Sequence, residues 1–304
     1  MARRRSKKKA HKILKTVILS GIFAAIRILS LHPAVTERIG NTVRGCFPEQ
    51  NIIQSVPAPV SGGKPPFHYT IKHPQYDNLS CGVPGPADTI VEREGYALGY
   101  IEKHEQSAWV QYVLTAEEVS RRTAKREGCF RPDPAIPTGS ATPQDYARSG
   151  YDRGHLAPAA DMSFSVKTMS ESFYMSNMSP QAPQFNRGIW NKLEKQVRHF
   201  AAREKRIVVV TGPVLPPDKS ITIGVNQVTV PRYYYKAIYD TTPPGKMIAF
   251  VLPNKDSSAD LRSFAVTVDH VEELTGLDFF SSVPQPEQER LERTVTTENW
   301  EWIR

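Results

Sequence analysis

The sequence contains only three cysteines, Cys46, Cys81 and Cys129, among its 304 residues. Their spacing matches none of the paired-cysteine patterns of zinc modules, so we expect no zinc site. An exported chain could form one disulfide, for which Cys46 and Cys81 are the candidate pair. The alternative is that all three are unpaired small hydrophobic residues.

Acidic residues are missing from the start of the chain. Residues 1–27 hold nine of the 39 Lys and Arg residues and no Asp or Glu, which leaves 30 basic against 31 acidic residues in the remainder. The formal net charge of +8 therefore comes from the N-terminal segment. Any basic surface that binds a polyanion must be local in the rest of the chain.

The chain also lacks a long uninterrupted apolar run. Residues 13–31 are mostly apolar, but Lys15 and Arg27 leave only residues 16–26 uncharged. A spanning helix prefers about 20 residues, whereas a signal peptide accepts a shorter core. Because no clean cleavage site follows, residues 1–31 are predicted to be either a cleaved signal peptide or an uncleaved signal anchor. This predicts a secreted, periplasmic or membrane-anchored protein, with mitochondrial import as the less favoured alternative.

Prolines crowd residues 32–90, which hold nine of the 25 prolines. Proline fixes φ and removes a backbone donor, so a linker is expected there rather than a long helix or a central strand. Residues 68–71 could still form a short edge strand. The globular domain is predicted to span residues 91–304.

The hydrophobic pattern of this domain alternates between strand and helix periods, without an internal repeat. We predict an α+β domain built on a mainly antiparallel sheet with flanking helices. The predicted strands are 95–101 and 108–114, joined as a hairpin, then 206–211, 228–238, 247–252 and 264–268; the predicted helices are 116–126, 168–176, 186–204 and 268–274, the last ended by Gly276.

A histidine, His155, lies in the pentad DRGHL at residues 152–156, after a turn-prone run. With an ordinary pKa of about 6.5, a histidine can accept a proton at neutral pH. Hydrolysis of a phosphodiester needs such a base for water, and a hard cation such as Mg²⁺ to neutralise the phosphate. The pentad alone is also compatible with a structural turn.

Three residues downstream of His155 have side chains that could hold a metal ion, its water or the phosphate. Asn186 is predicted to open the helix 186–204, where its amide oxygen could coordinate Mg²⁺ or its side chain could cap the helix. Glu194 shares a broad helical face with Asn186 and could hold a metal-bound water. Arg198, one turn beyond Glu194, could bind the scissile phosphate or form an ordinary surface ion pair with Glu194.

Two further residues have open roles. Asn177 could hydrogen-bond His155 or a nearby loop, or could simply be a turn residue ahead of a proline. Arg153 could lie near the phosphate, or could pair with a carboxylate for structural reasons.

Longer motifs surround these residues in a fixed order: DRGHLAPAAD at 152–161, FYMSNMSPQ at 173–181 and NRGIWNKLE at 186–194. Together they resemble the DNA/RNA non-specific endonuclease family, which includes mitochondrial endonuclease G and secreted bacterial sugar-non-specific nucleases. The resemblance covers roughly residues 90–284, because further landmarks match: GYALGY at 95–100, VTGPV at 210–214, YYYK at 233–236, FVLPN at 250–254 and LTGLDFF at 274–280.

The resemblance implies a ββα-metal (His-Me finger) domain. His155 would be the general base, Asn186 the Mg²⁺ ligand and Glu194 the residue that orients a metal-bound water. Arg198 would stabilise the transition-state charge, and Asn177 would support His155. The family also uses an upstream arginine, for which Arg126 and Arg131 are both candidates as substrate-binding residues.

The leading hypothesis is therefore a Mg²⁺-dependent nuclease, with Mn²⁺ as a substitute, that cleaves DNA and RNA with little sequence preference. A membrane contact through the N-terminal segment and a homodimer are further candidate partners. One alternative is an exported phosphodiesterase that acts on smaller nucleotides. Another is a catalytically silent nucleic-acid-binding protein of the same fold, which the joint presence of His155, Asn186 and Glu194 disfavours.

Overall fold

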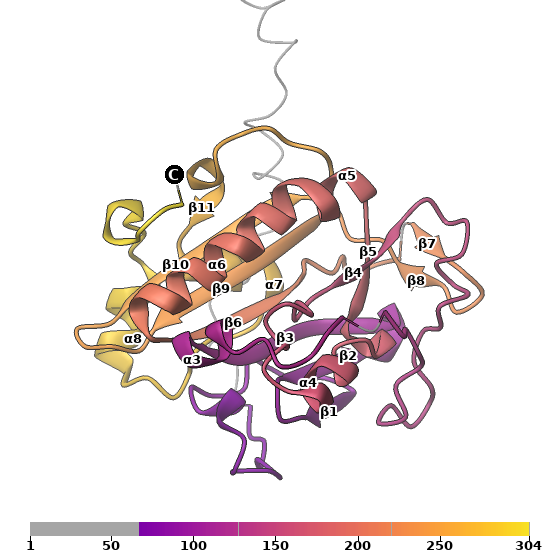
Figure 1. Ribbon diagram of the computed structural model, residues 1–304, viewed down its shortest axis with the longest axis horizontal. Helices are drawn as coiled ribbons and strands as arrows, with labels where there is room; N and C mark the ends of the chain where they lie inside the picture. Colours follow the sequence, from indigo (N-terminus) through magenta and orange to yellow (C-terminus); the bar gives the residue numbers. More distant parts are fainter. Residues whose placement is uncertain (1–66, 127, 220, 304) are drawn as a thin grey trace, which may run out of the picture. The chain divides into compact units, whose positions relative to one another are not determined.

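The computed structural model describes residues 67–126, 128–219 and 221–303. Its main element is a seven-stranded sheet in the order β1-β2-β3-β6-β9-β10-β11, in which every neighbouring pair is antiparallel (Figure 1). The predicted α+β class and the mainly antiparallel sheet are confirmed. The strands are β1 (Thr89–Glu92), β2 (Ala97–Ile101), β3 (Gln106–Thr115), β6 (Arg206–Pro213), β9 (Tyr233–Asp240), β10 (Lys246–Pro253) and β11 (Ala265–Val266).

Both faces of the sheet are covered, so its central strands are buried on both sides. On β9, Tyr234 and Ile238 join the core that packs under α6 (Asn191–Glu204), whereas Tyr235 and Ala237 face the opposite core. That second core receives α7 (Val268–Thr275) and α8 (Gln285–Glu292). In Figure 1, α6 lies across one face of the sheet and α7 lies behind it. The strict two-residue alternation of a strand explains the division.

A separate pair of short strands lies beside the main sheet. β4 (Asp152–His155) pairs antiparallel with β5 (Met178–Gln181), in a register that places His155 opposite Met178. The Gln181 side chain lies close to the β4 main chain, since a Cβ atom on Gly154 would lie 2.2 Å from it. Only glycine fits at that position without movement of its neighbour. Neither strand was predicted, since four residues are too few to show a period.

The helix predicted from residue 186 begins earlier and is not continuous. The helical run starts with α5 (Pro183–Phe185), continues as a π-helical turn η6 (Asn186–Trp190) and passes into α6. Gly188 breaks the turn with φ −99° and ψ −110°. Asn186 therefore lies inside the run with helical φ and ψ, so its predicted place at the helix start is wrong. The helical-face argument that joined it to Glu194 fails for the same reason.

Other elements are shorter than predicted or divided. The predicted strand 228–238 is split into β8 (Val228–Thr229), which pairs with β7 (Thr222–Ile223), and β9, because Pro231 offers no backbone donor between them. The polar helix is α3 (Ala116–Ser120), and the next helix is α4 (Val166–Glu171). Gly276 ends α7 in the left-handed conformation, as expected.

The packed part of the chain reaches further back than residue 91. The short helix η3 (Asp77–Leu79) carries buried Leu79 and Asn78, whose Nδ2 donates to two main-chain carbonyls, of Arg93 and Glu94. No strand forms at residues 68–71, where the Tyr69 hydroxyl instead donates to Glu92. Cys81 is buried with a free thiol. Cys46, the predicted signal or anchor at 1–31 and most of the predicted linker lie outside the described residues.

Candidate active site

His155 ends strand β4 in a nearly dry setting, with 7% of its surface exposed. It belongs to an aromatic cluster with Phe130 and Phe173, whose ring centroids lie 5.7 and 5.0 Å from the imidazole. Burial first, and then the positive charge of Arg126, lowers the pKa of His155 to about 3. The imidazole is therefore neutral at pH 7, with a lone pair on one ring nitrogen. Its Nε2 has no hydrogen-bond partner among the described residues.

Asn177 fixes the main chain immediately after His155. Its Oδ1 accepts from the Ala157 N–H at 2.9 Å, and its Nδ2 donates to the carbonyls of Ala157 and Ser172 at the same distance. Of the roles open to this residue, the structure shows the hydrogen bond to a nearby loop. The side chain is fully buried, so each of these bonds replaces water that cannot reach it.

Asn186 is oriented by a carboxylate on the strand that bears His155. Its Nδ2 donates to Asp152 Oδ2 at 2.9 Å, and Arg187 binds the same carboxylate at 2.8 and 2.6 Å. Burial alone would raise the pKa of Asp152, but the hydrogen bonds from Arg187 and Asn186 lower it below its ordinary value. With the amide nitrogen so engaged, the Oδ1 atom of Asn186 has no donor in the described structure. It is an oxygen atom available to a hard cation.

Glu194 lies in the first turn of α6 and is half-buried, and its carboxylate accepts no hydrogen bond from the described residues. Burial raises its pKa above the ordinary value, while the positive charges of Lys236, Arg198 and Arg126 oppose that rise. An unpaired carboxylate with poor solvation is the kind of group that a hydrated cation would stabilise. The donor set of Asn186 and Glu194 therefore fits a magnesium-type ion, which takes few protein oxygens and keeps several waters.

Arg198 does not form the surface pair with Glu194 that the i,i+4 spacing allowed. Its Nη1 donates instead to Asp161 at 2.6 Å, and Asp161 is fully buried. The second oxygen of Asp161 accepts from the Tyr112 hydroxyl at 2.9 Å. This pairing holds the guanidinium rigidly beside Glu194, because the carboxylate that binds it is itself fixed from the sheet.

Three arginines surround the aromatic cluster, and their surroundings differ. Arg153 is exposed and lies over Phe130 at 4.4 Å, and it makes no ion pair with a carboxylate among the described residues. Arg126 is exposed and lies over Phe173 at 5.3 Å, close enough to influence both His155 and Glu194. Arg131 lies over Tyr174 and donates to Ser170, so its guanidinium already serves the packing of that loop.

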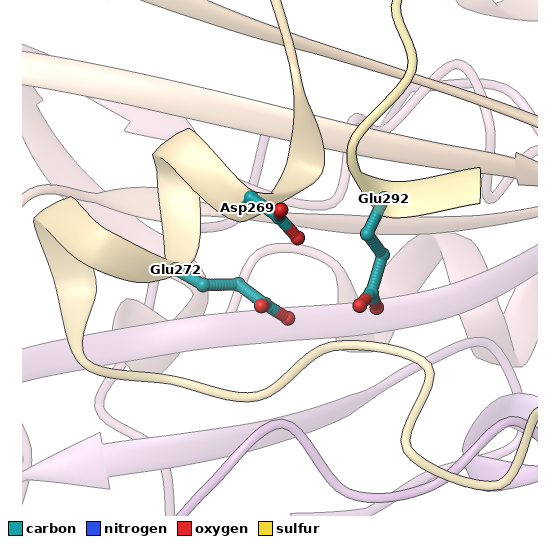
Figure 2. Close-up of side chains that lie close together, drawn as sticks. All are labelled: Asp269, Glu272 and Glu292. Carbon is teal, nitrogen blue, oxygen red and sulfur yellow. The ribbon is translucent and has the colours of Figure 1, made fainter. Parts of the chain in front are cut away.

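A second group of acidic residues is separate from these. Figure 2 shows Asp269 and Glu272 of α7 and Glu292 of α8 pointing toward one another, with one oxygen of each within 4.8 Å of the others. Burial, reinforced by Glu292, raises the pKa of Glu272 to about 9, and burial raises that of Glu292 to about 7. Glu272 accepts from the Phe279 N–H and Glu292 from Gln288. Protons and hydrogen bonds therefore account for this cluster without an ion.

Comparison with known proteins places the whole domain in a family. The sequence profile of the DNA/RNA non-specific endonucleases matches residues 75–286. The chain belongs to the DNA/RNA non-specific endonuclease family. Membership in this family confirms the ββα-metal fold class. It also confirms that the protein is an endonuclease of nucleic acids from a metal-dependent family.

Individual members of the endonuclease family show the extent of the match. A mitochondrial nuclease of Saccharomyces cerevisiae is 34% identical over 70% of this chain and 72% of its own length. Human mitochondrial endonuclease G is 34% identical over 66% of this chain and 72% of its own length. A nuclease of Nostoc sp. is 34% identical over 69% of this chain and 80% of its own length. A crystal structure of an EndoG/EndoGI complex aligns with a TM-score of 0.64 at 34% identity, covering 69% of this chain and 93% of that one.

Some residues of this endonuclease site were missed from the sequence. Asp152 and Asp161 lie within the quoted motif, but nothing in their spacing indicated that they would bind Asn186 and Arg198. Phe130 and Phe173 gave no signal, because an aromatic residue beside a loop is usually core.

Among the described residues, no helix combines the length and the apolar character needed to cross a membrane.

Proposed function

We propose that this endonuclease cleaves both DNA and RNA by attack of water on the phosphorus, with His155 as general base and Mg²⁺ held by Asn186. The observation that carries this proposal is the state of His155. The imidazole is neutral, its Nε2 is uncommitted, and Asp152 on the same strand fixes the amide of Asn186. A base and a cation ligand are thus held by one short strand.

The metal would supply charge neutralisation at the phosphate and assistance to the leaving alkoxide. Mg²⁺ is proposed because the two unpaired groups, Asn186 Oδ1 and the Glu194 carboxylate, are hard oxygen donors, and Mn²⁺ should substitute because it accepts the same ligands. Asn186 would coordinate the ion directly, and Glu194 would hold its hydration shell.

The side chains have separate tasks in the proposed reaction. His155 takes the proton from the attacking water, and Asn177 holds the main chain that follows the histidine in place. Arg198 places positive charge where the phosphate gains negative charge. Arg126 is proposed as the upstream substrate-binding arginine, since Arg131 is occupied by Ser170 and Tyr174. Arg153, exposed above Phe130, is proposed to contact the phosphate backbone.

Low sequence preference follows from what this site can contact. These groups address phosphate oxygens, which are the same at every base and carry no sequence information. Residues 28–304 have nearly balanced charge, so binding should depend on a few local cations rather than on a broad basic surface.

The test is a digest of supercoiled plasmid and of RNA by the full-length protein, with Mg²⁺, with Mn²⁺ and with EDTA. His155→Ala should lower kcat by about 100- to 10,000-fold, the range for a lost general base. The matched control is His270→Ala, which removes a half-buried histidine from α7, on the far face of the sheet. A wild-type protein that leaves both substrates intact in Mg²⁺ would refute the proposed reaction. A His155→Ala variant as active as His270→Ala would refute the assigned base.

We also propose that residues 1–31 export the protein or anchor it in a membrane, that the part of residues 32–90 ahead of η3 acts as a linker, and that the domain forms a homodimer. The mitochondrial relatives make import into mitochondria the competing destination. Cell fractionation of the full chain separates a membrane-bound, a secreted and a mitochondrial protein. Light scattering of the purified protein decides between monomer and dimer.

A further inference from the structure

Lys236 is a charged residue in the core that the proposed reaction does not use. It lies on β9 between Tyr234 and Ile238, on the face that α6 covers, and none of its surface is exposed. Lysine is almost never fully buried unless it is paired with an acid. Yet the partners of its Nζ among the described residues are a carbonyl, a hydroxyl and an aromatic ring, and none is a carboxylate. Such a costly placement calls for an account of what the ammonium group does there.

The ammonium group contacts three segments of the site at once. Its Nζ donates to Thr211 Oγ1 at 3.1 Å and to the main-chain carbonyl of Leu156 at 3.4 Å. It also lies 4.6 Å from the centre of the Trp190 ring. Leu156 directly follows His155, and Trp190 is the last residue of the π-helical turn that carries Asn186. One side chain of the sheet therefore reaches both the strand with the proposed base and the turn with the proposed metal ligand.

Lys236 also interacts electrostatically with Glu194, the residue proposed to hold the hydration shell of the metal. Of the nearby cations, Lys236 most strongly opposes the effect of burial on the pKa of Glu194. Glu194 in turn, followed by Asp161, favours the charged form of Lys236, although burial outweighs them and lowers the pKa of the lysine. Lys236 and Arg198 thus balance Glu194 and Asp161 in a region with little water.

We propose that Lys236 is a positioning residue, which holds the main chain after His155 against the sheet and packs its ammonium group against Trp190, at the end of the turn that carries Asn186. The proposal rests on the roles assigned above to His155 and Asn186. It makes the sheet, rather than the β4–β5 pair alone, the frame that keeps the base and the metal side in register. A small displacement of the Leu156 carbonyl would move the neighbouring imidazole, which has no hydrogen bond of its own at Nε2.

The test compares three full-length variants: Lys236→Met, Lys236→Arg and Tyr235→Phe. Lys236→Met keeps the length of the side chain but removes its charge and its hydrogen-bond donors. Lys236→Arg keeps the charge and the donors. Tyr235→Phe is the matched control, because it removes one buried hydrogen bond, from the Tyr235 hydroxyl to the Ala108 carbonyl, on the opposite face of the same strand. Should Lys236→Met not fold, Lys236→Gln replaces it, with a donor but no charge.

Two measurements separate positioning from mere stability. Lys236→Met should lower kcat by about 10- to 100-fold, as loss of a supporting residue does, with KM for plasmid within about twofold of wild type. Lys236→Arg should recover most of the rate. In the metal-free protein, the imidazole NMR signals of His155, assigned through His155→Ala, should shift in Lys236→Met and stay in place in Tyr235→Phe.

The outcomes that overturn the proposal are distinct. If Lys236→Met loses no more activity than Tyr235→Phe, or if Lys236→Arg is as slow as Lys236→Met, the ammonium group does not position the site. Unchanged His155 signals in Lys236→Met overturn it independently of activity. The NMR measurement needs no turnover, so it tests the contact to His155 even if the wild-type protein is inactive. An inactive wild-type protein would refute the proposed reaction, and only unchanged His155 signals would refute the positioning role.

Discussion

Replacement of Asp152 by alanine should weaken metal binding, because this carboxylate orients the proposed ligand. The Asn186 Nδ2 donates to Asp152 at 2.9 Å, and without that bond the amide can rotate and present its nitrogen to the ion. A hydrogen bond to a charged group contributes about 1.5–3 kcal/mol. With a tenfold change in affinity for each 1.4 kcal/mol, the Kd for Mg²⁺ should rise about 10- to 100-fold.

Arg187→Ala is the control for this experiment, since Arg187 binds the same carboxylate from solvent. Its side chain is 73% exposed, and water and salt screen an exposed ion pair so that it contributes little. The Kd should therefore change less than about fivefold. Calorimetric titration of the metal-free variants with Mg²⁺ measures both values, and the Mg²⁺ concentration for half-maximal plasmid cleavage checks them. Equal effects of the two substitutions, or an unchanged Kd in Asp152→Ala, would refute the reasoning.

Two further predictions concern the substrate and the pH dependence of stability. Arg126→Ala should reduce the slope of log KM for duplex DNA against log salt concentration by about one, which is the share of one phosphate contact. Arg131→Ala should leave this slope unchanged and lower the melting temperature. Equal slopes for both variants would show that Arg126 does not bind phosphate. Burial, reinforced by Glu292, gives Glu272 a folded pKa of about 9 against an ordinary value of 4.5, so its stabilising contribution is complete below about pH 4.5 and is lost as the pH rises toward 9. Glu272→Gln, which imitates the protonated form, should therefore raise the free energy of unfolding by roughly 3–5 kcal/mol at pH 8 and by less than about 1 kcal/mol at pH 5. Urea denaturation measures both values, and a gain that is equal at both pH values would contradict the raised pKa of Glu272.

The sequence predicted the elements whose periods are long enough to read. Strands β2, β3, β6 and β10 and helix α7 lie close to their predicted positions, because each combines several apolar residues at one period with a clear stop. The pairs β4–β5 and β7–β8 were not predicted, since two to four residues carry no period. Helix α8 was also missed, because its sequence is mostly polar and shows a narrow apolar face.

The residues proposed for catalysis could be named from the sequence because their order in three motifs matches a known family. Their partners could not, since the contacts join positions far apart in the chain. Arg198 binds Asp161, 37 residues away, rather than the glutamate one helical turn before it. Asn186 binds Asp152, 34 residues away, because the helical run begins at Pro183 and breaks at Gly188.

By itself, the sequence determined the family, the fold class, the near-balanced charge of the domain and the identity of His155, Asn186 and Glu194 as candidates. Only the tertiary structure decided the protonation state of that histidine, because its low pKa comes from burial between Phe130 and Phe173 and from the charge of Arg126. It also decided that Lys236 lies beneath the site, 80 residues from the carbonyl it binds. Burial and charge act through space, so they depend on packing that the local pattern of a sequence does not encode.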